Sequence, residues 1–255
     1  MIKKIKKLKS EEFEEIRILK TNKSKLCKNK IVLFSLNQIK QALKFNIDIN
    51  YIVTDSKDIL SFAESKNIDG FETTSGILNK LHNSKNKIDV LAVCQKNEDG
   101  FLLNNDNVII LDDIIDHGNI GTIIRTGVAY NYNCFLYPKS DFYPYTNKIL
   151  NSSRCTNLIS NFKNFDNELK LYNFLKENNF LIITTSPHGH ELNEEKLNYL
   201  KANYKIALFL GNEKYGVKDF FIKNSDYNFS LELRNNVESL NVGVFAGILF
   251  DKLSI

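Results

Sequence analysis

Short apolar runs alternate with segments of helical periodicity along most of the 255-residue chain, a pattern typical of α/β proteins. In the first part we expect strands at residues 31–34, 51–54, 70–73 and 89–94, separated by helices at residues 38–44, 58–65 and 75–82. In the second part we expect strands at residues 108–112, 134–137, 180–185, 205–210 and 228–233, with helices at residues 120–130, 168–177, 194–200 and 242–253. The longer elements of this second part predict a parallel sheet with helices on both faces.

A polar stretch separates the two parts of the pattern. It reads Lys96-Asn97-Glu98-Asp99-Gly100 and continues into an Asn-rich and Asp-rich run up to Asn107. Clusters of such residues between periodic segments are typical of loops. We therefore expect one domain over residues 1–96, a linker over 97–106 and a second domain over 107–255.

Basic residues are concentrated at the start of the chain. Residues 1–30 contain eleven Lys and Arg against four Glu, whereas the whole chain has a net charge of only +4. Lys and Arg on phosphates release counterions, so this leader indicates contact with a polyanion such as RNA. A solvated, frayed terminal helix explains the same composition equally well.

The lengths of the apolar runs argue against a membrane protein, and the spacing of cysteine and histidine argues against a metal site. No run approaches the roughly 18 apolar residues that a membrane span needs, so we expect a cytoplasmic protein without membrane contact. The four cysteines lack a C-x-x-C pair and lie in or beside apolar segments, which predicts buried free thiols: Cys27, Cys94, Cys134 and Cys155. The cluster His188-Gly189-His190-Glu191 lacks a second pair of ligands, so we expect an exposed loop there.

Three segments with glycines and polar residues follow predicted strands. In open α/β sheets ligands bind beyond the carboxyl ends of strands, so these segments are candidate site loops. In the first, Asn119 is a candidate helix N-cap and Gly121 permits a close approach of backbone or ligand. Arg125 follows on the next helix, about one and a half turns after Asn119. An ordinary helix start with an exposed Arg125 is the alternative interpretation.

The other two segments follow the fourth and fifth strands of the second domain. In one, Gly211 and Gly216 flank a loop that contains Glu213, an arrangement that can leave backbone groups available for a ligand. In the other, Ser239 and Asn241 precede a helix that is apolar on nearly every side, which predicts enclosure by the core and by a partner subunit. A glycine-flanked turn and a plain serine N-cap are the alternatives.

Together, the patterns N-x-G-x-x-x-R-T, L-G-x-E-x-x-G and E-S-L-N-V, in this order, resemble the three motifs of the SpoU/TrmH-type methyltransferases of the SPOUT superfamily. The resemblance covers residues 107–255, and residues 31–95 are similar to the small α/β RNA-binding domain, itself like a ribosomal protein, that many members carry. It implies an α/β fold whose C-terminal parallel-sheet domain forms a deep trefoil knot. It also implies a homodimer.

The resemblance implies an enzyme that uses S-adenosylmethionine to methylate a ribose 2′-hydroxyl in structured RNA, with ribosomal RNA favoured over transfer RNA. The reaction centre would contain Asn119, Arg125, Glu213, Ser239 and Asn241. The backbone around five residues would hold the cofactor: Leu210, Gly211, Leu231, Leu233 and Leu240. Arg125 and Arg154 would contact RNA. The combination G-N-I-G-x-I-x-R-T with S-S-R resembles the thiostrepton- and nosiheptide-resistance branch of the family.

Arg125 has two possible roles in such a reaction. The family proposal makes this arginine a general base, but arginine side chains keep their proton in proteins. A cationic Arg125 that stabilises a developing alkoxide, or binds the adjacent phosphate through two nitrogens, is the simpler interpretation.

The sequence departs from the family pattern at three positions. Glu232 and Leu233 stand where proline and methionine are frequent, and Gly243 where a second serine is common. A non-catalytic RNA-binding or ribosome-assembly protein that keeps the fold therefore stays open. A transfer RNA 2′-O-methyltransferase also stays open, because ribosomal and transfer RNA enzymes of the family share most of these motif residues. A conventional Rossmann-type methyltransferase is disfavoured because no G-x-G-x-x-G follows an early strand.

Overall fold

The computed structural model describes residues 2–4, 11–20, 29–82, 88–96, 107–191, 193–231, 233–235, 237 and 239–253. The chain divides into two compact units, residues Met1–Asp99 and Gly100–Ile255. The expected linker over 97–106 lies outside the described residues, as do Cys27, Glu232 and much of the basic leader.

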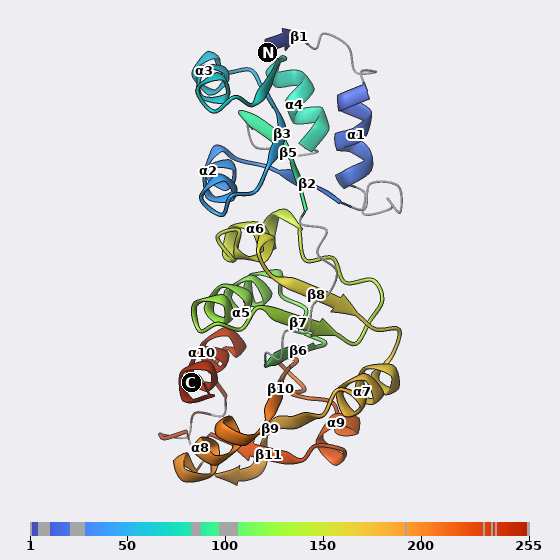
Figure 1. The fold of residues 1–255 in the computed structure, drawn as a ribbon, viewed down its shortest axis with the longest axis vertical. Helices are drawn as coiled ribbons and strands as arrows, with labels where there is room; N and C mark the ends of the chain where they lie inside the picture. The colour runs from blue at the N-terminus through green and yellow to red at the C-terminus, as the bar shows by residue number, and fades with distance from the viewer. Residues whose placement is uncertain are drawn as a thin grey trace. The chain divides into compact units, whose positions relative to one another are not determined.

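The N-terminal unit contains a mixed five-stranded sheet (Figure 1). Its elements are β1 (Ile2–Lys4), α1 (Glu11–Lys20), β2 (Lys30–Leu33), α2 (Leu36–Lys44), β3 (Ile49–Thr54), α3 (Lys57–Ser65), β4 (Asp69–Glu72), α4 (Ser75–His82) and β5 (Val90–Gln95). The strand order is β1-β4-β3-β5-β2, with β5 antiparallel to both of its neighbours and the other pairs parallel. The strands and helices expected between residues 31 and 95 are confirmed, whereas β1 was not expected and α1 was considered only as a solvated, frayed helix.

Helix α1 belongs to the core of this unit. Phe13, Ile16 and Leu19 are spaced three residues apart, lie on one face of the helix and are buried. They pack with Leu78 and Leu81 of α4. The alternative of a solvated terminal helix is therefore wrong for residues 11–20.

The C-terminal unit contains a six-stranded sheet in which every neighbouring pair is parallel, as expected. Its strands are β6 (Val108–Asp112), β7 (Cys134–Tyr137), β8 (Asn161–Asn164), β9 (Phe180–Glu191), β10 (Lys205–Gly211) and β11 (Tyr227–Ser230). Its helices are α5 (His117–Ala129), α6 (Asn147–Ser152), the 3-10 turn η1 (Thr156–Leu158), α7 (Glu168–Glu177), α8 (Glu194–Asn203), α9 (Asp219–Lys223) and α10 (Val242–Leu253). Of these elements, α6, η1, β8 and α9 were not expected.

Helices cover both faces of this parallel sheet (Figure 1). Because side chains alternate along a strand, Ile109 and Leu208 face the core shared with α5 and α10, whereas Ile110 and Phe209 face the core shared with α7 and α9. Both faces of the central strands are buried, which accounts for their continuous apolar sequence.

The strand order β11-β9-β10-β6-β7-β8 decides which loops can meet. Strand β10 pairs with β6 so that Gly211 is opposite Asp112, and the loops that follow these two strands start side by side. Strand β11 lies at the edge of the sheet and ends at Ser230, three residues earlier than expected. By Asn241, whose side chain contacts Asn119, the chain has come back from the sheet edge to α5.

The cysteines and the segment around His188 and His190 differ in how well the sequence predicted them. Cys94, Cys134 and Cys155 are buried thiols outside any disulfide, as predicted. The loop expected at His188 and His190 is wrong, because β9 is long enough to include both residues, although both are exposed as expected. In the described part of the chain, no helix has the length and apolar character needed to cross a membrane.

Candidate active site

Helix α5 starts three residues before the start expected from the sequence. The carboxylate of Asp116 accepts hydrogen bonds from the backbone N–H groups of Gly118 (2.6 Å) and Asn119 (3.0 Å), so Asp116 is the N-cap. The expectation that Asn119 caps the helix is wrong, and its side chain is available for other contacts. Lys148 lies 2.5 Å from the other oxygen of Asp116, and this bond and the two N–H bonds lower the pKa of Asp116.

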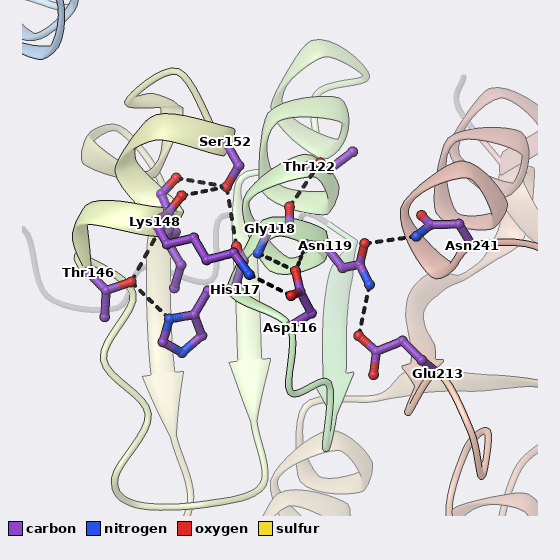
Figure 2. A network of polar contacts seen from close by, with 11 residues as sticks. Asp116, His117, Gly118, Asn119, Thr122, Thr146, Lys148, Ser152, Glu213 and Asn241 are labelled. Atoms are coloured by element: carbon purple, nitrogen blue, oxygen red, sulfur yellow. Dashed lines mark hydrogen bonds and ion pairs between the residues drawn. The ribbon is translucent and has the colours of Figure 1, made fainter.

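The side chain of Asn119 joins the three predicted site segments. Its Nδ2 donates to Oε1 of Glu213 (2.9 Å), and its Oδ1 accepts from Nδ2 of Asn241 (2.9 Å). Figure 2 shows Asn119 between Glu213 and Asn241, with the start of α10 on one side. Oδ1 of Asn241 in turn accepts the N–H of Gly243 (2.9 Å) and caps α10. Three side chains from distant parts of the chain therefore form one polar chain.

The chemistry of the partners determines which way each amide points. An ionised Glu213 can only accept a hydrogen bond, so the NH₂ group of Asn119 must face it. The oxygen of Asn119 is then directed to Asn241, whose own oxygen is occupied by the backbone of α10. Replacement of Asn119 or Asn241 by a carboxylate would disturb this order, and so would replacement of any of the three by a side chain of different length.

The loop that carries Glu213 is a tight turn between two glycines. Asn212 and Gly216 exchange two backbone hydrogen bonds (3.0 and 2.9 Å), and Gly216 has the left-handed φ of +71° that favours glycine. A Cβ on Gly211 would lie 2.1 Å from the carbonyl carbon of Gly216, so the two backbone segments touch. Oδ1 of Asn212 accepts the N–H of Lys214 (2.9 Å), which completes the turn.

The buried carboxylate of Asp112 holds the end of the same loop. Its Oδ2 accepts the N–H of Lys218 (2.8 Å), while the Lys218 ammonium lies 3.7 Å from Oδ1 and binds Glu168 (2.7 Å). Burial raises the pKa of Asp112, against the lowering effect of the Lys218 N–H and charge. Sequence reasoning missed Asp112 as a residue that supports the site loop. A carboxylate that ends an apolar strand was the available signal.

The two candidate arginines are both exposed, Arg125 on α5 and Arg154 in the turn between α6 and η1. Within the described residues, neither the Arg125 nor the Arg154 guanidinium group makes a hydrogen bond or an ion pair, so both are available to a ligand. Helix α6 packs closely on α5, since a Cβ on Gly121 would lie 1.9 Å from Oγ of Ser152. This packing holds the segment before Arg154 against the helix that carries Arg125.

The residues expected to hold a cofactor occupy different environments. The side chain of Leu210 is fully buried in the core, so only its backbone can face a ligand. Leu231, Leu233 and Leu240 are half-buried in the irregular segment between β11 and α10. Ser239 is exposed in that segment, and no described contact joins it to the Asn119 side chain.

Residues 106–251 match the SpoU rRNA Methylase family, a span that contains all of these candidates. The chain belongs to the SpoU rRNA methylase family. An uncharacterised tRNA/rRNA methyltransferase of Borreliella burgdorferi is 30% identical over 160 residues, which cover 63% of this chain and 66% of that relative. A 23S rRNA (guanosine(2553)-2′-O)-methyltransferase of Bacillus subtilis is 25% identical over 254 residues, which cover 97% and 98% of the two chains.

A solved structure confirms the fold of this SpoU family chain. The AdoMet-bound rRNA methyltransferase from Sinorhizobium meliloti superimposes with a TM-score of 0.75 at 16% identity, covering 99% of this chain and 97% of that one. The likeness extends over both units. At 16% identity, this likeness shows the fold alone.

One departure from the family pattern has a structural reason. A Cβ on Gly243 would lie 3.0 Å from Cγ2 of Thr122 on α5 and 3.2 Å from Oδ1 of Asn241. Glycine at this position therefore allows α10 to lie close to α5 while Asn241 caps the helix. The departure at Gly243 fits the contact between Asn241 and Asn119 and does not weaken it.

Proposed function

We propose that this SpoU family protein uses S-adenosylmethionine to methylate a ribose 2′-hydroxyl in ribosomal RNA. The chain of hydrogen bonds through Asn119 is the observation that carries the proposal, because it joins one side chain from each of the three motifs. The Bacillus subtilis relative, named as a 2′-O-methyltransferase of 23S rRNA, supports the reaction and the substrate. The similar structure with AdoMet bound supports the cofactor.

The described residues after β11 are the proposed cofactor site. Leu231, Leu233 and Leu240 offer half-buried apolar surface that suits an adenosyl group. Within the described residues of 231–240, one backbone hydrogen bond is formed, from Val237 to Arg234 (3.3 Å). The backbone polar groups of these residues, with those of Leu210 and Gly211, would bind the cofactor. When bound, it supplies an activated methyl group.

The protein groups must then position the ribose and assist the loss of its proton. Oε2 of Glu213 makes no hydrogen bond to a described residue and would accept one from the ribose hydroxyl, while Asn119 holds Oε1. The Arg125 guanidinium would stabilise the negative charge that develops on the 2′-oxygen. Ser239 and Asn241 would complete the centre, and Arg154 would bind a phosphate of the RNA.

Several properties of the whole molecule belong to the same proposal. Residues 107–255 would form the trefoil-knotted methyltransferase domain, with residues 97–106 as linker. Residues 1–96, like a ribosomal protein, would bind RNA. Exposed Val244 (56%) on the apolar helix α10 supports a homodimer whose second subunit covers that helix. We place the protein in the cytoplasm, where ribosomal RNA is modified, and without a bound metal.

The test is methyl transfer by the purified protein to defined RNAs. Unmodified large-subunit ribosomal RNA and a pool of unmodified transfer RNAs would each be incubated with radiolabelled S-adenosylmethionine, and 2′-O-methylated nucleotides mapped by their resistance to alkaline cleavage. We expect labelling at one ribose of the ribosomal RNA. Labelling of transfer RNA alone would redirect the substrate. Binding of RNA without any binding of cofactor would instead support the non-catalytic alternative.

A further inference from the structure

Tyr215 is the most exposed of the large apolar and aromatic side chains in the described part of the chain, with 78% of its surface accessible. It lies two residues after Glu213, on the turn between Gly211 and Gly216. Exposed aromatic rings in monomers are common one at a time, so exposure alone decides little. The position of this ring beside the proposed reaction centre is what makes it informative.

The backbone that carries Tyr215 is held firmly. Oδ1 of Asn212 accepts the N–H of Tyr215 (3.1 Å) as well as that of Lys214 (2.9 Å). The turn is closed by the bonds between Asn212 and Gly216, and the buried Asp112 accepts the N–H of Lys218, two residues after Gly216. Because the backbone of this turn is already held, little backbone freedom is lost when a ligand binds to the ring, which favours binding.

A positive charge accompanies the ring. Nζ of Lys214 lies 5.0 Å from the centroid of the Tyr215 ring. A flat aromatic surface beside an ammonium group matches the two parts of a nucleotide, since the base can stack on the ring and the phosphate can pair with the cation. Apolar peptide ligands would make no use of the charge, and an anion without a base would make no use of the ring.

The neighbouring loop presents a second exposed apolar side chain. Ile115 is 71% exposed in the loop after β6. That loop starts beside the turn of Tyr215, because Asp112 and Gly211 are paired at the ends of β6 and β10. Both apolar groups therefore extend from the strand ends that also position Asn119 and Glu213.

We propose that Tyr215 is a stacking platform for a nucleobase of the substrate RNA, either that of the methylated nucleotide or its immediate neighbour. The proposal rests on the proposed function, and it adds a contact that selects unpaired bases. The ring would hold the base while the ribose lies at Glu213. Lys214 would pair with the adjoining phosphate.

The chain contains no tryptophan, which allows a direct measurement. Tyr215→Trp introduces a single indole whose fluorescence a stacked base would quench. Unmodified large-subunit ribosomal RNA should quench it, and inorganic polyphosphate, which has charge but no bases, should not. Tyr199→Trp is the matched control, since Tyr199 is 53% exposed on α8 with Lys196 Nζ 5.7 Å from its ring. Its fluorescence should not respond to the RNA.

A second measurement compares binding affinities. Tyr215→Ala should weaken binding of the ribosomal RNA by roughly 5- to 100-fold and leave polyphosphate binding unchanged, because stacking on an aromatic ring is lost. Tyr215→Phe should bind RNA as the wild type does. Lys214→Ala should weaken both ligands, and Tyr199→Ala neither.

The outcomes separate this proposal from the proposed function. Wild-type RNA affinity in Tyr215→Ala would overturn it, as would an equal loss for RNA and polyphosphate. If the fluorescence of the indole at position 215 did not change with RNA but changed with protein concentration, the ring would contact a second copy of the chain. That result would also overturn the stacking proposal. A wild-type protein that binds RNA through Tyr215 but never methylates it would reject the proposed function and keep the stacking site.

Discussion

Asn119 and Glu213 are 94 residues apart in the sequence, and their side chains are joined by a hydrogen bond of 2.9 Å. Asn119 also accepts a bond from Asn241, 122 residues further along the chain. Two polar contacts thus connect the helix after β6, the turn after β10 and the start of α10.

Asn119→Ala removes both bonds and should reduce kcat/KM for RNA methylation by at least about 100-fold, because small displacements of reacting groups cost rates of that order. Stability should fall by only about 1–2 kcal/mol, since the three side chains are not deeply buried. Asn151→Ala is a suitable control, as it removes the bond of Asn151 to Asn147 (3.2 Å) on the surface of α6. Unchanged turnover in Asn119→Ala would show that the polar chain is not part of the reaction centre.

Arg125→Ala should leave the fold intact within about 0.5 kcal/mol, because the exposed Arg125 has no described protein partner. Binding of cofactor and RNA should persist while kcat falls by about 100-fold or more, as expected for the loss of a group that stabilises developing charge. Arg154→Ala should mainly raise KM for RNA. Wild-type turnover in Arg125→Ala would remove Arg125 from the mechanism.

Gly211→Ala and Gly216→Ala should differ in their effects. The new Cβ at Gly211 would meet backbone at 2.1 Å, so the turn must move, at a cost of about 3 kcal/mol. At Gly216 there is open space, and only the left-handed backbone opposes the substitution, which costs about 1–2 kcal/mol. Thermal unfolding would measure the loss of stability in each variant. Methylation should fall further in Gly211→Ala than in Gly216→Ala. Equal stability of the two variants would contradict the tight contact.

Asp112→Asn should change how stability depends on pH. Burial raises the pKa of Asp112 above its ordinary 3.8, so the folded protein holds this proton to higher pH than the unfolded chain. The contribution of Asp112 to stability is therefore full below about pH 3.8 and is lost as pH rises through its folded pKa. The stability of Asp112→Asn relative to wild type should increase as pH rises from 4 toward neutrality, as measured by urea unfolding monitored in the C-terminal unit.

The control for this experiment is Asp116→Asn. The bond with Lys148 lowers the pKa of Asp116 below 3.8, so its stabilising contribution is present above that pH and is lost only on further acidification. The difference between Asp116→Asn and wild type should then be constant from pH 4.5 upward. A decrease in the relative stability of Asp112→Asn over the same range would mean that the pairing with Lys218 outweighs burial.

Most of the regular elements were predictable from local pattern. The sequences of β6 and β10 each contain several consecutive apolar residues, which indicates strands that are buried on both faces. Short elements were missed because their signals are weak: α9 has five residues and β8 has four. The extension of β9 through His188 was missed because its polar residues pair with β11 by backbone bonds that do not depend on side-chain pattern.

The start of α5 shows a limit of a different kind. Both Asp116 and Asn119 are good N-cap residues, and the sequence does not rank them. The structure selects Asp116 because Lys148 of α6 lies beside it and because Asn119 is engaged by Glu213 and Asn241. A tertiary contact therefore decided a local choice.

The sequence by itself determined most of the succession of strands and helices along the chain, the resemblance to the family, and the residue types of the three motifs, because these depend on periodicity and on short patterns. Only the tertiary structure decided that Asn119, Glu213 and Asn241 touch, while Ser239 stays exposed without joining them. The physical reason is the strand order. Strands β6 and β10 pair directly, whereas β11 lies at the sheet edge, roughly 15 Å from β6 at ordinary strand spacing, so the segment after it must return across the unit before Asn241 can meet Asn119.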